Sequence, residues 1–342
     1  MPTFWYFVLA LMMTVYVILD GFDIGAGIVH GLVARNDEER RAVFQAIGPY
    51  WDGNEVWLLA AGGTLYFAFP LLYASSFSGF YLPLIMVLWL LILRGCSIEF
   101  RSHLSEPVWR TFFDFGFSFS SILLAIFLGA ALGNVLRGVP LDENASFFEP
   151  LWTNFVPSGN TGVLDWYTVL AGVVALLSLA LHGAAYLVMK TNGDLRERSR
   201  KLAMRLWYAV LPLCLLALIA TYYVRPPAVV NAHKPVLWLF PPLVVLSLAT
   251  QWWALRRNRD ALAFYSSCGY IVGVLGGAAV AMYPYLLPDN VHLEHSLTIY
   301  NAASSPYAMK IALLWWPLGM ALAITWFYVV YRSFRGRVEA EP

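Results

Sequence analysis

The sequence predicts an all-α, polytopic membrane protein: a single integral membrane domain over residues 1–342 with nine transmembrane helices. Hydrophobic residues make up 60% of the chain and charged residues only 13%, whereas a soluble domain carries about 25% charged residues. The apolar residues also occur in uninterrupted runs that are long enough to cross a bilayer as helices. Aromatic residues, at 16%, suit both membrane interfaces and core packing.

Short connections separate the nine apolar runs, so there is no room for a soluble domain. The first run lacks a basic segment before it and a small-residue cleavage site after it, so we expect a retained span and not a cleaved signal peptide. We expect the first four helices and the next four to form two four-helix bundles, with the ninth at the edge. The predicted spans are 4–29, 56–74, 79–98, 116–136, 163–189, 206–224, 236–255, 261–287 and 309–331.

Lysine and arginine are distributed unequally over the two sets of loops, which predicts an outside N-terminus and a cytoplasmic C-terminus. The loops on the other side contain only Arg137, Arg225, Lys234 and Lys310. The predicted cytoplasmic loops contain Arg35, Arg40, Arg41, Arg101, Arg110, Lys190, Arg196, Arg198, Arg200, Lys201, Arg205, Arg256, Arg257, Arg259, Arg332, Arg335 and Arg337.

Several classes of function find no support in the sequence. The net charge of +1 gives no electrostatic case for nucleic-acid binding. Cys96, Cys214 and Cys268 lie in separate apolar runs with no CxxC, so neither a zinc site nor covalent haem is predicted. No Walker motif or GxGxxG follows a strand. His292 and His295 flank Glu294 without a third metal ligand, which favours a solvated loop.

Two acidic residues, Asp20 and Asp23, interrupt the first apolar run. An ionised carboxylate near the middle of a membrane helix costs roughly 2.5–3.5 kcal/mol. The two residues are three apart and therefore lie on the same side of a helix. We expect this acidic face to point into the protein interior, although a purely structural pairing of these acids is the alternative.

Glycines in the spans indicate places where helices approach closely, because small residues let two backbones come together. The glycines concerned are Gly21 with Gly25, Gly27 with Gly31, Gly62 with Gly63, and Gly273 with Gly276 and Gly277.

Three more acidic residues lie at a similar predicted depth to Asp20 and Asp23. Asp52 and Glu55 stand at the start of the second span, and Glu99 at the end of the third, all toward the cytoplasm. Carboxyl groups can both release and accept protons, so a series of them with water between its members can conduct protons. The sequence therefore predicts a ladder of titratable groups that is open to the cytoplasm.

Each of these polar residues also has a structural interpretation. Asp52 and Glu55 have the spacing of a helix N-cap and its N3 partner. Glu99 has Arg94 and Arg101 nearby for an ion pair at the membrane edge. His182 in the fifth span fits a hydrogen bond between helices or, alternatively, a haem ligand.

Several segments, taken in order, resemble subunit II of the cytochrome bd-type quinol oxidases, including the cyanide-insensitive branch. Two of these segments, residues 20–27 and 51–57, are long and keep a fixed separation. The resemblance covers nearly the whole chain. The segments are residues 20–27 (DGFDIGAG), 51–57 (WDGNEVW) with 61–63 (AGG), 77–81 (FSGFY), 94–102 (RGCSIEFRS), 133–140 (GNVLRGVP), 296–298 (SLT) and 303–305 (ASS).

The resemblance implies a heterodimer with a haem-bearing subunit I in the bacterial cytoplasmic (inner) membrane, in contact with lipid and with room for small single-span subunits. It implies that the complex oxidises quinol at its outer face and reduces dioxygen to water with protons from the cytoplasm. Two haems b and one haem d are then held by subunit I, while this chain binds no cofactor or metal and is inactive alone. The sequence does not distinguish which quinone is used.

The resemblance also assigns roles to residues. Asp20, Asp23, Asp52 and Glu99 stand at positions of a proton route, and Glu55 is a further candidate where relatives often carry glutamine. Supporting charge and packing positions are Arg94, Arg101, Trp51, Asn54 and Trp57. Two other functions remain open: a proton-coupled secondary transporter, in which the same acids bind protons near broken helices, and a purely scaffolding subunit.

Overall fold

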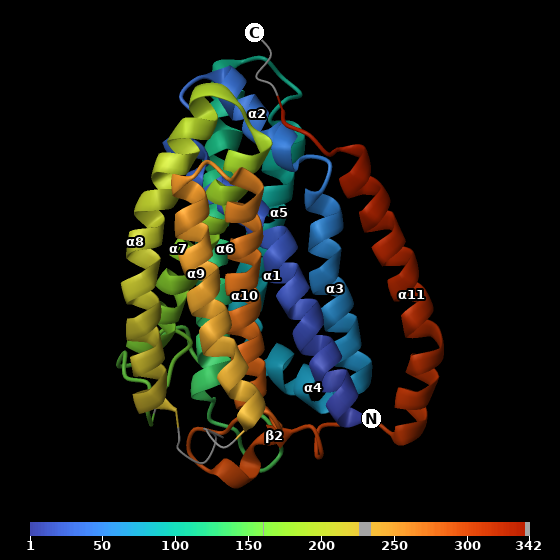
Figure 1. Cartoon of the computed structure of the whole chain (residues 1–342). Coiled ribbons are helices and arrows are strands. Elements are labelled where there is room, and N and C mark those ends of the chain that lie inside the picture. The colour runs from blue at the N-terminus through green and yellow to red at the C-terminus, as the bar shows by residue number, and fades with distance from the viewer. Residues whose placement is uncertain (160, 226–233, 339–342) are drawn as a thin grey trace.

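The computed structural model describes residues 1–159, 161–225 and 234–338, and within these residues it is a bundle of long helices (Figure 1). In this part of the chain, eight helices are long and apolar enough to cross a membrane, and a bent helix pair is the ninth candidate. This arrangement confirms the all-α, multi-pass fold. The eight are α1 (Pro2–Val33), α5 (Tyr81–Phe100), α6 (Pro107–Arg137), α7 (Trp166–Lys190), α8 (Gly193–Val224), α9 (Phe240–Arg256) with the short 3₁₀ turn η1 (Pro235–Leu239), α10 (Asp260–Met282) and α11 (Pro306–Ser333).

The two ends of the bundle differ in structure. One end carries the short helix α2 (Asp37–Ile47) and the C-terminus, and we call it the α2 end. The other carries the N-terminus and two short antiparallel strands, β1 (Tyr285–Leu287) and β2 (Leu297–Thr298), which flank the 3₁₀ turn η2 (Leu293–His295). We call it the strand end. The α2 end is the one for which the sequence predicts a cytoplasmic location.

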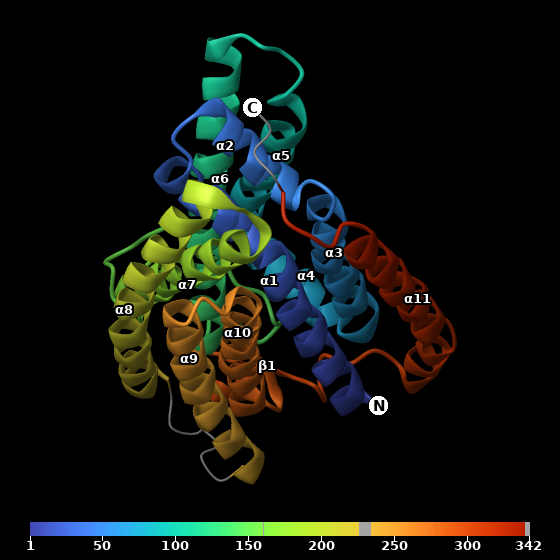
Figure 2. The same ribbon diagram turned by 45° about the horizontal axis from the view of Figure 1, so that its top comes forward.

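Helix α1 occupies the centre of the bundle. It packs against α6, α7 and α10 and also against α3 (Trp51–Ala68). Every residue from Asp20 to Gly27 is buried, so the acidic stretch faces other helices on all sides. Helix α11 lies at the edge, as Figures 1 and 2 show, and only Met309 and Ala312 of this helix are buried.

The predicted second span, 56–74, is not one straight helix. Helix α3 ends at Ala68, and α4 (Pro70–Gly79) leaves it at an angle of 120°. The break falls at Phe69 because Pro70 disfavours helical backbone at the residue before it. Pro70 also has no N–H group to donate to the helical hydrogen-bond pattern. The bent pair thus replaces the single helix that periodicity predicts.

Three other predicted boundaries are wrong. Helix α8 begins at Gly193 and not at residue 206. Helix α10 ends at Met282 and not at residue 287, because Pro284 interrupts the ladder and Tyr285–Leu287 pairs instead as β1. Helix α6 starts at Pro107, well before residue 116. Its first turns contain polar residues, which make this part of the sequence less hydrophobic than a typical span. One of these residues is the buried acid Asp114.

Glycine allows close helix packing at some of the predicted positions. A Cβ atom on Gly25 would lie 2.0 Å from the carbonyl oxygen of Leu179, so α1 and α7 touch backbone to backbone there. Gly273 and Gly276 pack against Val244 and Phe240 of α9. The prediction is wrong elsewhere: among the described residues, no atom lies within 4 Å of a Cβ added at Gly31, Gly62 or Gly63.

Candidate functional site

Asp20 and Asp23 lie at the centre of a polar site between α1, α3 and α5. Both side chains are completely buried, with 0% exposure. The close approach of α7 behind Gly25 closes the opposite side of α1, so the carboxyl groups can only face the neighbouring helices. The expectation that this acidic face points into the protein interior is confirmed.

Arg94 of α5 joins two of the acids. Its Nη2 atom donates to Oδ1 of Asp20 at 2.6 Å and also to Oε1 of Glu55 on α3. Arg94 and Asp20 are fully buried, whereas 25% of the Glu55 side chain is exposed. A buried ion pair of this kind is strongly destabilised when one partner is removed, because the other charge is then left without compensation.

Asn54 of α3 holds the third acid. Its Nδ2 atom donates to Oδ2 of Asp23 at 2.7 Å and to the carbonyl oxygen of Leu19 at 3.2 Å. The hydroxyl group of Tyr331 on α11 donates in turn to Oδ1 of Asn54 at 3.1 Å. Asp23 thus has an amide as its neighbour, and no guanidinium bonds to it.

The site contains more carboxyl groups than cations. Asp20 and Glu55 share the guanidinium of Arg94, while Asp23 is bonded to the Asn54 amide. Oδ2 of Asp20, Oδ1 of Asp23, and Nε and Nη1 of Arg94 are buried with hydrogen-bonding capacity that no described protein atom uses. Keeping three buried carboxylates ionised beside one cation would carry a large desolvation cost.

Two predicted acids lie outside this buried group. Asp52 and Glu99 are both exposed at the α2 end. Asp52 stands at the second position of α3, whose N-cap is Tyr50, so the prediction that Asp52 is the N-cap is wrong. The ion pair of Glu99 with Arg94 or Arg101 is also absent from the described residues, because both arginines bind other acids.

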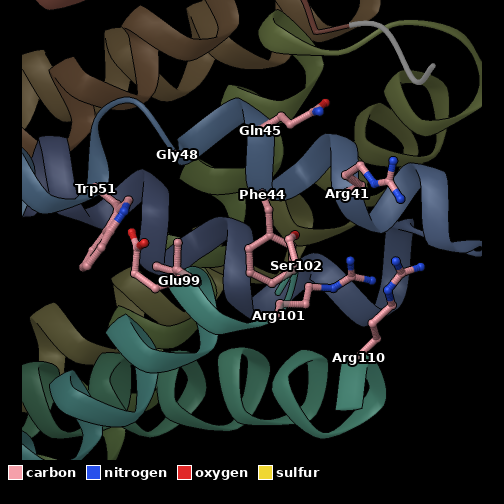
Figure 3. A pocket seen from close by; sticks show the side chains of 10 residues that line it. Arg41, Phe44, Gln45, Gly48, Trp51, Glu99, Arg101, Ser102 and Arg110 are labelled. Carbon is pink, nitrogen blue, oxygen red and sulfur yellow. The ribbon is translucent and has the colours of Figure 1, made fainter. Parts of the chain in front are cut away.

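A cavity of about 540 Å³ opens beside Glu99 at the α2 end. Figure 3 shows Trp51 and Glu99 together at one side of it and Arg101 and Arg110 at the other. The Trp51 ring lies 3.5 Å from the position of a Cβ atom on Gly95, one residue from Arg94. The cavity therefore reaches close to the buried site from the predicted cytoplasmic side. Trp57, one of the predicted packing positions, is buried deeper in α3, where its ring contacts Phe327 of α11.

Arg101 belongs to a second cluster, which sequence reasoning did not identify. Its Nε atom donates to Oδ1 of Asp114 at 2.6 Å and its Nη2 atom to Oδ1 of Asp37 at 2.8 Å. Nε2 of His30 lies 2.9 Å from Asp114, and Nη1 of Arg40 donates to it at 3.0 Å. Burial alone would lower the pKa of Arg101, but Asp114 and Asp37 raise it above its ordinary value.

One sequence signal was available for this cluster. His30 follows Asp23 by seven residues and so lies on the same face of α1. Its partner Asp114 is 84 residues away, and a predicted span that started at 116 left this acid outside the membrane. Its contacts depend on the packing of α1, α5 and α6.

A third cluster lies at the strand end. Arg137 at the end of α6 donates to Oε1 of Glu149 at 2.6 Å and also to Asp165, the N-cap of α7. Thr161 donates to Oε1 of Glu149 at 2.7 Å. Burial raises the pKa of Glu149, and the Asp165 charge adds to this effect, although Arg137 and Thr161 oppose it.

The intramembrane histidines do not fit the role of a haem ligand. Nε2 of His182 lies 2.9 Å from the carbonyl oxygen of Ile18, and Nδ1 lies 2.7 Å from Oγ of Ser267. Both ring nitrogens are therefore engaged in contacts between α7, α1 and α10, which confirms the hydrogen bond between helices. Nε2 of His30 faces Asp114. In the loop at the strand end, His295 lies 3.4 Å from Asp289, and no group of three metal-ligating side chains occurs in the described ranges.

Comparison with known proteins agrees with this arrangement. The chain is 31% identical over 370 residues to a probable cytochrome oxidase subunit 2 of Haemophilus influenzae, covering 98% of this chain and 94% of that protein. It is 31% identical over 367 residues to cytochrome bd-I ubiquinol oxidase subunit 2 of Escherichia coli K12, with 98% and 95% covered. For cytochrome bd ubiquinol oxidase subunit 2 of Bacillus subtilis the identity is 28% over 337 residues, with 96% and 95% covered.

The fold is similar to that of a chain in the solved bd oxidase from Geobacillus thermodenitrificans, with a TM-score of 0.75 at 22% sequence identity and 98% of each chain covered. Residues 1–334 match the family described as cytochrome bd terminal oxidase subunit II. Neither finding supports a secondary transporter. The conserved architecture and the sequence match together mean that this chain belongs to the family of cytochrome bd terminal oxidase subunit II.

Proposed function

We propose that this chain, as one subunit of a haem-containing quinol oxidase, supplies a route for protons from the cytoplasm to the site of oxygen reduction. The complex would comprise this chain and a haem-bearing subunit I as a heterodimer in the bacterial cytoplasmic membrane. Two haems b and one haem d would be held by subunit I, since the intramembrane histidines of this chain are engaged in other contacts. The haems supply the electron transfer to dioxygen, and the residues of this chain handle protons.

One observation carries this proposal: a buried site holds three carboxyl groups and one guanidinium, which bonds to Asp20 and Glu55 while Asp23 is bonded only to the Asn54 amide among the described residues. A scaffold gains nothing from excess buried acid, because each unpaired carboxylate raises the free energy of the folded state. A proton carrier needs such groups, because a carboxyl can take up a proton and pass it on.

The positions of the acids suggest an order. The cavity beside Trp51 and Glu99 would collect protons from the cytoplasm. Glu55, the only partly exposed member of the buried group, would receive them. Asp23 lies one helical turn closer to the α2 end than Asp20 on α1, so a proton from the cytoplasm would reach it before Asp20. Asp20 shares the Nη2 atom of Arg94 with Glu55, which places these two carboxyls side by side for a proton transfer at the inner end of the route.

The test uses the purified two-subunit complex and the substitutions Asp20→Asn, Asp23→Asn and Asp52→Asn. We expect slower quinol-dependent oxygen consumption per haem in complexes that retain the normal haem content. Normal turnover in all three variants would contradict a proton route. A scaffolding role predicts the reverse pattern, with less assembled complex and unchanged turnover in what assembles.

A further inference from the structure

Lys190, the last residue of α7, ties the end of the chain to the bundle. Its side chain is 8% exposed. Its Nζ atom donates to the hydroxyl group of Tyr50 at 3.0 Å, to the carbonyl oxygen of Phe334 at 2.8 Å and to that of Gly336 at 3.1 Å. An ammonium group has three donors, so all of them are used. The backbone oxygen of Lys190 also accepts from the N–H of Val338 at 2.7 Å.

The acceptors of Lys190 lie just beyond α11. Phe334 is the C-cap of this helix, and its carbonyl oxygen also accepts from the Tyr50 hydroxyl at 2.7 Å. A cation at the C-terminal carbonyls of a helix is favourable because it opposes the partial negative charge there. The part of α11 near this end has no fully buried residue, so these polar contacts help to seat the end of the helix, together with the packing of Val330 and Tyr331 against the core.

Tyr331 lies one turn before Phe334 and connects this end of α11 to the acidic site. Its ring packs on that of Tyr50, with centroids 4.5 Å apart. Its hydroxyl group donates to Oδ1 of Asn54, and Nδ2 of Asn54 donates to Asp23. A contact path therefore runs from the Lys190 ammonium through α11 to a carboxyl of the proposed proton route.

The Tyr331 hydroxyl and the Leu19 carbonyl oxygen together orient the Asn54 amide. An amide can turn over and exchange the places of its oxygen and nitrogen. With the Tyr331 hydroxyl bound to Oδ1 and the Leu19 oxygen bound to Nδ2, the nitrogen faces Asp23 and donates to it. Without the Tyr331 bond, Oδ1 loses its donor and the amide is less firmly held, which weakens the hydrogen bond to Asp23.

We propose that Lys190 is a positioning residue that, by clamping the carbonyls of Phe334 and Gly336, holds Tyr331 against Asn54 and thereby sets the hydrogen bond to Asp23. We call Lys190, Tyr50, Phe334 and Gly336 the tail clamp. Its effect on turnover rests on the proposed proton route through Asp23. Its effect on the hydrogen bonds of Asp23 does not.

The test compares Lys190→Met, Lys190→Arg and Tyr331→Phe in the purified two-subunit complex. The first readout is the carboxyl infrared band that Asp23→Asn removes, followed against pH, and the second is oxygen consumption per haem. We expect Lys190→Met and Tyr331→Phe to move this band alike and to lower turnover about fivefold. Lys190→Arg should restore the normal band, because a cavity of about 210 Å³ beside Tyr50 has room for the guanidinium.

The control is Arg335→Ala. Arg335 lies in the same tail and carries the same charge, but its side chain makes no hydrogen bond or ion pair within the described chain. It should leave both readouts unchanged. The double variant Lys190→Met with Tyr331→Phe should be no worse than either single variant, because both act on one path.

Three results would overturn the clamp: an unmoved Asp23 band in Lys190→Met, an Asp23 band that moves equally in Arg335→Ala, or additive effects in the double variant. If Lys190→Met does not assemble, a chain that ends at Ser333 removes the acceptors of Lys190 and is judged by the same band. If Asp23→Asn leaves turnover normal, the proton route fails, and the clamp is judged on the band alone.

Discussion

The Nη2 atom of Arg94 lies 2.6 Å from Oδ1 of Asp20 at a place where neither side chain is exposed. Arg94 is also bonded to Glu55, so one cation from α5 holds acids of α1 and α3 together. This contact links three helices that are distant in sequence. It also makes the stability of the chain depend on the same groups as the proposed proton transfer.

Loss of the Arg94 guanidinium should therefore prevent assembly. Arg94→Gln leaves Asp20 buried without a cation, which we expect to cost about 3–5 kcal/mol. Haem-containing complex recovered from membranes measures the effect. Asp20→Asn in the same chain should recover part of the yield, because it removes the uncompensated charge. The control is Arg41→Gln, since 50% of the Arg41 side chain is exposed and exposed pairs contribute about 0–1 kcal/mol. Equal losses for Arg94→Gln and Arg41→Gln would contradict this view.

Neutral substitutions of the acids should slow turnover in the order of their burial. Asp20→Asn should lower oxygen consumption per haem by about 10²-fold, because the side chain is fully buried and solvent cannot replace its carboxyl group. Glu55→Gln should have a smaller effect, since 25% of this side chain is exposed and solvent can substitute for it. Glu99→Gln, at an exposed position, should have the smallest effect. Turnover and its solvent isotope effect test the order, with exposed Glu38→Gln as control. An inverted order would count against the proposed direction of transfer.

The cluster at the strand end predicts a pH dependence of stability. The Glu149 carboxyl has an ordinary pKa of 4.5, and burial raises the pKa in the folded protein. Between these two values the folded state binds more protons than the unfolded state, so the free energy of unfolding falls as pH rises through this window. Thermal unfolding midpoints from pH 4.5 upward should show this fall, and Glu149→Gln should flatten it. Glu143→Gln, exposed in the same loop, should keep the wild-type slope. A Glu149→Gln profile parallel to wild type would exclude this origin.

The contact between α1 and α7 predicts opposite outcomes for two glycines of one helix. Gly25→Ala would bring a methyl group 2.0 Å from the carbonyl oxygen of Leu179, so the helices must separate. Gly31→Ala meets no atom within 4 Å in the part of the chain that the structure describes, and alanine favours helix over glycine by about 1 kcal/mol. We expect Gly25→Ala to lower the yield and the unfolding midpoint of the complex, and Gly31→Ala to leave both unchanged or raised. Tolerance of Gly25→Ala would mean that the helices are less tightly packed.

Composition and periodicity predicted the helices and the buried face of Asp20 and Asp23 because these depend on local sequence. They could not predict which cation the acids share. Arg94 follows Asp20 by 74 residues, and the pairing depends on how α5 approaches α1. The cluster of His30 and Asp114 could not be predicted for the same reason.

Local sequence patterns also gave wrong predictions at positions where tertiary packing determines the structure. The spacing of Asp52 and Glu55 fits a capping pair, but the N-cap of α3 is Tyr50, two residues before Asp52, and Glu55 bonds to Arg94. Gly62 and Gly63 have the composition of a packing site, yet no helix of the described chain approaches them. The tail clamp had no sequence signal at all, because Lys190 counted only as one positive charge in a cytoplasmic loop.

The depth of the acid group has an electrical consequence. Asp20 and Asp23 lie in the middle of a helix that crosses the membrane, so a proton that reaches them from one side has already passed through part of the transmembrane voltage. Moving one elementary charge across 100 mV is worth about 2.3 kcal/mol. If protons follow the proposed route, each one stores energy in the membrane before it meets oxygen, and respiration should slow as the voltage opposing this uptake grows.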